Sequence, residues 1–192
     1  MQNNVYTRIF LENKWLSSFD RIKVIEYIHN MQNLLAETST NFGLNSNEVK
    51  YITDILLNNL LVQIYAVEVL GYKNGCRTPG ADGKVLNNTF ASKLELLKEI
   101  KKYRNRKPAP LKRIYINNNQ KEKRPINIPS VIDRGIQILF FLVLDPIIES
   151  HSDHHSFGFR KGRNSIMAVG AVQKFLQRKY SDCSNSLENI YI

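Results

Sequence analysis

Residues 156–165, which read SFGFRKGRNS, hold the side chains with the clearest chemical potential in this sequence. Two glycines allow the backbone to approach a ligand closely, and three cations surround them: Arg160, Lys161 and Arg163. The segment leads into a predicted helix, whose free N–H groups and dipole favour anions. This pattern indicates a site for a nucleic-acid phosphate. The alternative is a basic turn whose side chains only fold the loop.

The net charge of +10 is concentrated in one part of the chain. Residues 98–134 contain twelve Lys or Arg and three Asp or Glu, which gives +9 over 37 residues. Such concentration is typical of a surface that binds a polyanion, and nucleic acid is the partner that it favours. A solvated basic face without a ligand is the alternative.

The sequence lacks the residue patterns that several other kinds of catalytic or binding site require. No two of the seven Asp residues are adjacent, no GxxxxGK phosphate loop occurs, and no Ser-His-Asp order stands out. His151, His154 and His155 cluster with Asp153, but without the spacing of a zinc site. We therefore expect a polar surface loop there and no metal site.

Composition also argues against a membrane-spanning or secreted protein. The longest apolar run, residues 138–144, is seven residues long, whereas a membrane-spanning helix needs about 20. Residues 1–8 contain no apolar core of a secretory signal, and two distant cysteines predict a reducing compartment. Asn, Ile and Lys, which have A/T-rich codons, occur 21, 20 and 16 times, and this favours an A/T-rich genome such as that of an organelle.

Apolar spacing predicts the elements that would position these residues. Helices are expected at residues 19–38, 45–70, 90–103, 131–149 and 165–180, the fourth interrupted near Pro146. Alternation predicts a β-hairpin from residues 112–116 and 124–128, with a basic tip. Pro125 indicates that its strand lies at an edge or is only partly paired. The fold class is therefore α+β, mainly helical, with a basic β-hairpin.

Smaller signals locate the helix ends and faces. Asn45 and Glu48 resemble a capping box, and Gly71 is a plausible stop for the second helix. In the last helix four apolar residues are expected to face inward: Ala168, Ala171, Val172 and Phe175.

Four ordered blocks resemble the reverse transcriptases of group II introns, also called maturases. Residues 157–163 are similar to the family's GFRPGR signature, and residues 74–83 (NGCRTPGADG) to its KGxxTPGVDG loop. Residues 108–113 with 124–134 resemble the fingers hairpin that ends in RPLGIPxxxDR, and residues 137–149 resemble the helix after it. Trp15 and the two helices to residue 70 fit the family's N-terminal extension.

This resemblance implies a helical N-terminal extension at residues 1–71 and a fingers-like domain at residues 72–192. The chain would end before the first catalytic aspartate of the palm, so we expect no catalytic residue and no cofactor here, with Mg²⁺ only if a palm exists elsewhere. Asn118 stands where the family has a triphosphate-binding Lys, whereas Arg124 aligns with its second nucleotide contact. Lys161 replaces the proline of GFRPGR.

The leading hypothesis is an RNA-binding, maturase-like protein that assists intron splicing by neutralising phosphates and recognising shape. One alternative is the fingers fragment of an active RNA-directed DNA polymerase, with a separate palm and thumb chain. Another is a structural component of an organellar ribonucleoprotein such as a ribosome. An organelle, a mitochondrion rather than a plastid, is the expected location, and no membrane is expected as a partner. The predicted RNA-facing residues are Lys101, Lys102, Arg104, Arg106, Lys107, Lys112, Arg113, Lys121, Lys123, Arg124, Arg134, Arg160, Lys161 and Arg163.

Overall fold

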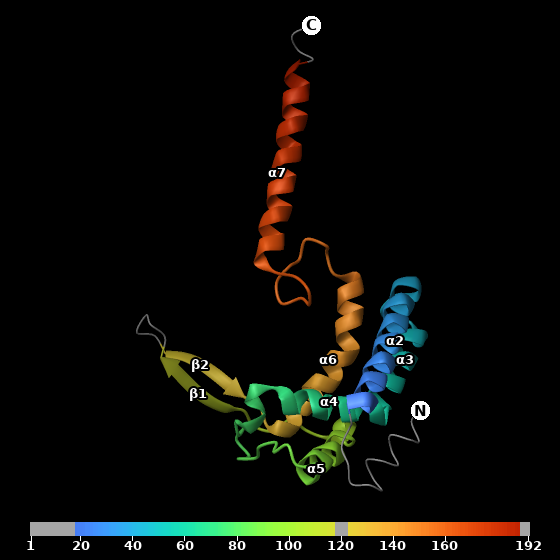
Figure 1. Ribbon diagram of the computed structural model, residues 1–192, viewed down its shortest axis with the longest axis vertical. Coiled ribbons are helices and arrows are strands. Elements are labelled where there is room, and N and C mark those ends of the chain that lie inside the picture. The colour runs from blue at the N-terminus through green and yellow to red at the C-terminus, as the bar shows by residue number, and fades with distance from the viewer. Residues whose placement is uncertain (1–17, 118–122, 189–192) are drawn as a thin grey trace. The chain divides into compact units, whose positions relative to one another are not determined.

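The computed structural model describes residues 18–117 and 123–188 and divides the chain into two compact units, Met1–Ile147 and Ile148–Ile192 (Figure 1). The predicted α+β class is confirmed, because the described residues are mainly helical and form one antiparallel β-hairpin. The boundary expected between residues 71 and 72 rests on the resemblance and stays a prediction. Trp15, Asn118 and Lys121 lie outside the described residues.

Three helices begin the first unit: α2 (Ser18–Phe42), α3 (Asn47–Asn58) and α4 (Leu60–Tyr72). The single helix expected at residues 45–70 is wrong, because α3 and α4 meet at a bend of 62°. Gly71, the expected stop, is the penultimate residue of α4. Helix α2 confirms the first predicted helix and continues four residues beyond it.

Asn59 causes the break between α3 and α4. Its backbone is extended, and its side-chain oxygen accepts the N–H of Leu61 at 2.8 Å, which starts a new helix. Its amide nitrogen also donates to the Tyr27 hydroxyl at 2.9 Å. The cap of α3 is Ser46 rather than Asn45, with an oxygen that accepts from Val49 at 3.2 Å. The apolar pattern runs across Asn59 and therefore hides this boundary.

The loop after α4 contains a short 3₁₀ helix, η1 (Asn74–Arg77), and Thr89 caps the next helix, α5 (Phe90–Ile100). Another 3₁₀ turn, η2 (Tyr103–Asn105), follows. Gly80 lies so close to the chain before α6 that an added Cβ would stand 2.8 Å from the Ser130 Cα.

Strands β1 (Lys112–Asn117) and β2 (Lys123–Ile128) pair antiparallel and confirm the predicted hairpin. Tyr115 lies opposite Pro125 in this register, with Arg113 opposite Asn127. Figure 1 shows the two strands running out from the helices of the first unit.

Helix α6 (Val131–His151) passes through Pro146 without a break, so the predicted interruption is wrong. Proline has no N–H, and the carbonyl of Leu142, four residues earlier, loses its helical donor. Gln32 of α2 replaces that donor, because its Nε2 donates to the Leu142 oxygen at 2.6 Å. A side chain more than 100 residues away in sequence thus satisfies the group that the proline leaves unpaired.

Helix α7 (Ser165–Glu188) extends eight residues beyond the predicted end. Ala168 and Ala171 are half-buried, but Val172 and Phe175 are 59% and 68% exposed, which contradicts the expected inward face. An apolar stripe at helical spacing identifies one face of a helix, but it does not identify what covers that face.

The core of the first unit surrounds a buried carboxylate. Glu68 of α4 is 2% exposed, and Arg21 Nη2 of α2 lies 2.7 Å from its Oε1. Lys93 Nζ of α5 lies 2.9 Å from its Oε2. Leu35, Ile64 and Leu97, each at most 1% exposed, belong to the same core. One ionised group therefore joins three helices.

Within the described residues, no single helix is long and apolar enough to cross a membrane, while α3 and α4 taken together, bent as they are, reach that length and composition.

Gln32→Leu should lower the free energy of unfolding by about 1–3 kcal/mol, because it leaves the Leu142 carbonyl unsatisfied. Pro146→Ala restores an N–H for that carbonyl, so the cost of Gln32→Leu should fall by about 1 kcal/mol in the Pro146→Ala background. Urea unfolding of the four proteins measures this coupling.

Asn33→Leu is the matched control, because Asn33 is exposed on the same helix, and its effect should stay within about 0.5 kcal/mol. Additive effects of Gln32→Leu and Pro146→Ala would contradict the assigned role of Gln32.

Candidate nucleic-acid interface

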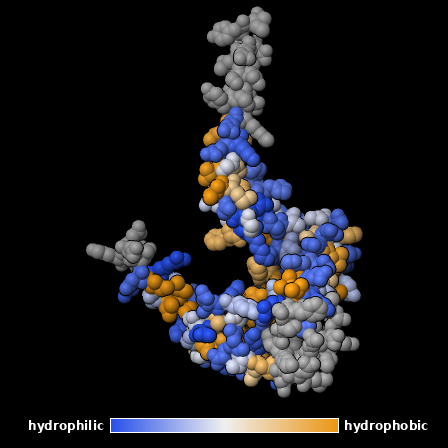
Figure 2. Space-filling model, in the orientation of Figure 1, coloured by the Kyte–Doolittle hydropathy of each residue, from blue (hydrophilic) through white to orange (hydrophobic). Residues whose placement is uncertain are grey.

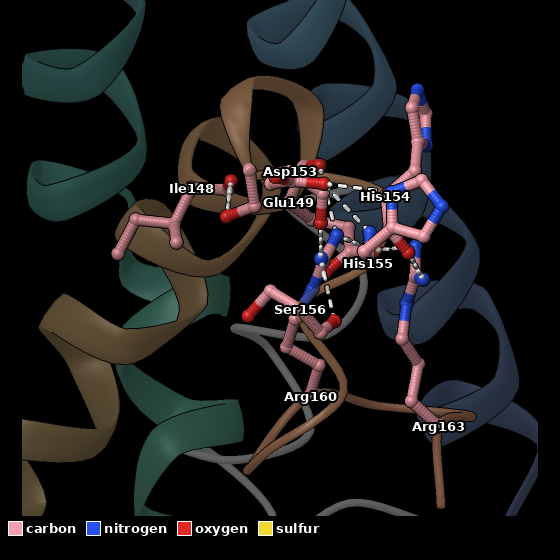
Figure 3. A network of polar contacts seen from close by, with 9 residues as sticks. Ile148, Glu149, Asp153, His154, His155, Ser156, Arg160 and Arg163 are labelled. Carbon is pink, nitrogen blue, oxygen red and sulfur yellow. Dashed lines mark hydrogen bonds and ion pairs between the residues drawn. The ribbon is translucent and has the colours of Figure 1, made fainter. Parts of the chain in front are cut away.

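The loop between α6 and α7 is organised by Arg160. Its Nε and Nη2 donate to the two carboxylate oxygens of Glu149 at 2.7 and 2.6 Å, and its Nη1 donates to the carbonyls of Asp153 and Ser156 at 2.6 and 3.0 Å (Figure 3). A fifth bond, at 3.4 Å, joins Nη2 to the Glu149 carbonyl. All five donors of this guanidinium are therefore engaged inside the loop.

Arg163 closes the same loop from its other end. Its Nη1 donates to the His154 carbonyl at 2.6 Å, Nη2 lies 3.5 Å from Glu149 Oε1, and the guanidinium lies 5.7 Å from the centre of the Phe157 ring. Immediately before Arg160, Phe159 adopts a φ of 59°, a left-handed conformation that is uncommon outside glycine. The arginines hold a backbone path that is unfavourable by itself.

These contacts bear on the predicted phosphate site at residues 156–165. The side chains of Arg160 and Arg163 are only 10% and 20% exposed, whereas Lys161 is exposed. Two of the three cations thus act inside the loop. This arrangement favours the alternative of a basic turn that folds the loop, and the phosphate site stays a prediction.

The cations after α5 are arranged around carboxylates. Arg104 Nη2 lies 2.7 Å from Asp54, and its Nε donates to the Tyr103 hydroxyl at 3.0 Å. Lys102 Nζ lies 3.1 Å from Glu99, and the hydrogen bond from Lys102 lowers the pKa of Glu99. Partial neutralisation of this kind reduces the field that the local charge count suggests.

Arg106 and Arg134 are held by neighbouring segments. Arg106 is 24% exposed and lies 3.5 Å from Glu99 and 3.7 Å from Asp133. Arg134 donates to the carbonyls of Gly75 and Thr78, the latter at 2.7 Å, and so joins the start of α6 to η1. Arg106 thus pairs with two carboxylates, whereas Arg134 holds backbone carbonyls in place.

The hairpin carries four exposed predicted cations. Lys112 and Arg113 of β1 and Lys123 and Arg124 of β2 are exposed, and neither strand contains Asp or Glu. Lys101 and Lys107, which precede the hairpin, are exposed as well. The structure thus brings four of the predicted residues together on two paired strands. Lys121 lies outside the described residues.

No metal site is formed within the described part of the chain, where no three His, Cys, Asp or Glu side chains converge. Asp153 instead accepts the backbone N–H of His155 at 2.7 Å, and this bond lowers the pKa of Asp153. His154 and His155 lie in this exposed turn, while His151 is the exposed last residue of α6.

Sequence reasoning did not identify Glu149 or Gln32, although each completes an interaction of a residue that it singled out. Glu149 lies in the predicted helix, but its pairing with Arg160 spans eleven residues and leaves no signal in a single sequence. The pairing of Tyr115 with Pro125 could be predicted from the sequence, because the register of a hairpin determines which residues lie opposite each other.

Comparison with known proteins adds a relationship over part of the chain. No protein-family model matches. The chain is 31% identical over 115 residues to Protein YkfC of Escherichia coli (strain K12), which covers 58% of the chain and 29% of that protein. It is 28% identical over 91 residues to Group II intron-encoded protein LtrA of Lactococcus lactis subsp. cremoris, which covers 43% of the chain and 15% of that protein.

The chain thus matches less than a third of the length of these curated relatives. The match to LtrA supports a relationship to the maturases and reverse transcriptases of group II introns, in agreement with the resemblance of the sequence motifs.

The Glu149–Arg160 pair should make the stability of the second unit sensitive to acid. The hydrogen bond from Arg160 lowers the pKa of Glu149 below its ordinary value of 4.5. The ion pair therefore contributes its full stabilisation of the second unit above pH 4.5. This stabilisation is lost as the pH falls through the lowered pKa of Glu149. The difference in thermal stability between wild type and Glu149→Gln should be largest near neutral pH and should shrink below pH 4.5.

Arg160→Gln is the control, because it removes the guanidinium that lowers the pKa of Glu149. In the Arg160→Gln background, the change in thermal stability caused by Glu149→Gln should therefore not shrink below pH 4.5. Thermal unfolding of the four proteins between about pH 3 and pH 7 checks both statements. An effect of Glu149→Gln that is the same at every pH would refute the role of this pair.

Proposed function

We propose that this chain binds structured RNA through its basic hairpin, as part of a protein derived from a group II intron maturase. The observation that carries the proposal is the hairpin itself, where four exposed cations lie on two strands without a carboxylate. A rod-like polyanion can approach such a surface without displacing internal ion pairs.

The relationship to LtrA supports intron RNA as the ligand class. The proposal keeps residues 72–192 as a fingers-like domain after an N-terminal extension, as the sequence motifs imply. Binding by phosphate neutralisation and shape would let the chain stabilise folded intron RNA and assist splicing without nucleotide chemistry. An organelle, a mitochondrion in particular, is the proposed location, and a ribonucleoprotein is the proposed assembly.

A second candidate is the fingers part of an active RNA-directed DNA polymerase, and the length of the matched relatives favours it. Arg124 would then contact the incoming nucleotide, and Mg²⁺ would be bound by carboxylates of a palm outside this sequence. Primer extension that requires Mg²⁺ and is lost in Arg124→Ala would support this candidate. Intact mass of the native protein separates the two, since 22.3 kDa leaves no room for a palm.

RNA affinity should fall steeply with salt. If roughly five cations meet phosphates, a plot of log K against log salt should slope by about −3.5 to −4.5. Arg124→Ala should weaken binding and reduce the slope by about one, because one phosphate contact is removed. Fluorescence anisotropy with a labelled, folded intron RNA measures both quantities.

Lys50→Ala is the charge-matched control, because Lys50 is exposed on α3, away from residues 98–134 in sequence, and the slope should not change. Affinity that does not depend on salt would exclude electrostatic RNA binding. Equal slopes for Arg124→Ala and the wild type would show that the hairpin is not the contact surface.

A further inference from the structure

The two faces of the hairpin differ in chemistry. Directly opposed residues of an antiparallel pair point to the same face, so the register separates the side chains into two groups. One face carries Lys112 and Arg124 beside four isoleucines: Ile114, Ile116, Ile126 and Ile128. The other face carries the only aromatic ring of the two strands, together with Arg113, Tyr115, Asn117, Lys123, Pro125 and Asn127.

We propose that Tyr115 and Pro125 form a stacking platform for one unpaired base of a single-stranded RNA segment. This inference rests on the proposed RNA-binding function and names the part of the RNA that the hairpin recognises. The Tyr115 side chain is 61% exposed, and Pro125 is exposed as well, so the ring has a face open to a ligand.

The identity of Pro125 fixes the local geometry. Proline has no N–H to exchange, which favours a non-hydrogen-bonded Tyr115–Pro125 pair, the type in which opposed Cα atoms approach to about 4.5 Å. At this distance the pyrrolidine ring lies across the hairpin from the tyrosine side chain, within reach of a cross-strand contact.

Cations flank the ring at both ends. Arg113 precedes Tyr115 by two residues, and Lys123 lies opposite Asn117, two residues after it, so each begins about 7 Å along the strand from the ring. Arg113 Nε donates to Asn127 Oδ1 at 3.1 Å, which orients the guanidinium on this face. A base stacked on Tyr115 would therefore have a cation available for the phosphate on either side.

The chemistry of the platform selects unpaired RNA over duplex RNA. In an A-form duplex the bases are stacked on one another, and proteins contact mainly phosphates and 2′-hydroxyls. A tyrosine ring gains most from a base that is free to stack on it. The opposite face offers aliphatic groups, of which Ile116 is 48% exposed, and Figure 2 shows hydrophobic surface over the hairpin. Isoleucine can shield a base but has no π-face.

The experiment uses a short single-stranded RNA with one 2-aminopurine and the same strand annealed to its complement. Stacking on Tyr115 should quench 2-aminopurine fluorescence in the single strand. Tyr115→Ala should abolish the quenching and weaken single-strand affinity about 5- to 150-fold, the range that stacking of one base spans. Tyr115→Phe keeps the ring and should retain both properties.

Two readouts separate stacking from a general loss of structure. Tyr115→Ala should leave duplex affinity and the salt slope unchanged, because no charge is removed. Ile116→Ala, on the opposite face, is the matched control and should retain the quenching. Circular dichroism and thermal unfolding confirm that each variant is folded.

The platform would be overturned if Tyr115→Ala quenched 2-aminopurine as strongly as the wild type does. It would also be overturned if Tyr115→Ala lost affinity equally for the single strand and the duplex. Either result would leave electrostatic RNA binding in place. A wild-type protein that binds neither of these RNAs nor the folded intron RNA would instead overturn the proposed function. The two failures are therefore distinguishable.

Discussion

The carboxylate of Glu68 is the constraint on which the first unit depends. A charge that is 2% exposed is costly to bury, and it is tolerated here because Arg21 and Lys93 contact its two oxygens. These partners come from α2 and α5, and Glu68 from α4, so the three helices have one arrangement that leaves no buried charge unpaired. Apolar packing alone would allow many more arrangements. The helices in turn provide the body from which the hairpin extends.

Arginine has two separate uses in this chain. Arg134 and Arg160 direct their donors to backbone carbonyls and, for Arg160, to a carboxylate, and so fix loops that contain little regular structure. Arg113 and Arg124 lie exposed on strands without acidic residues. The planar guanidinium suits both tasks, because its five donors match several carbonyls as well as a phosphate. Residue type therefore cannot distinguish a structural arginine from one that meets RNA, whereas burial can.

The sequence allowed the helices, the hairpin and its edge proline to be predicted, because these follow from local periodicity and backbone chemistry. It did not allow the break at Asn59 or the continuity at Pro146 to be predicted. Both depend on side chains that are distant in sequence, Tyr27 and Gln32, which satisfy polar groups that local rules leave open. The candidate interface divides in the same way. The positive charge is visible in the composition, but the partners of Arg104, Arg106 and Arg160 appear only in three dimensions.

The distribution of these partners changes how the net charge is understood. Residues 98–134 carry +9, yet Lys102, Arg104 and Arg106 lie against carboxylates of Glu99, Asp54 and Asp133. A paired cation still contributes to the long-range field that attracts a polyanion, but a close contact with phosphate would have to compete with its partner. The hairpin cations face no such competition from their own strands. Long-range attraction and close contact are thus assigned to neighbouring parts of the same basic segment, and the hairpin is the part suited to close contact.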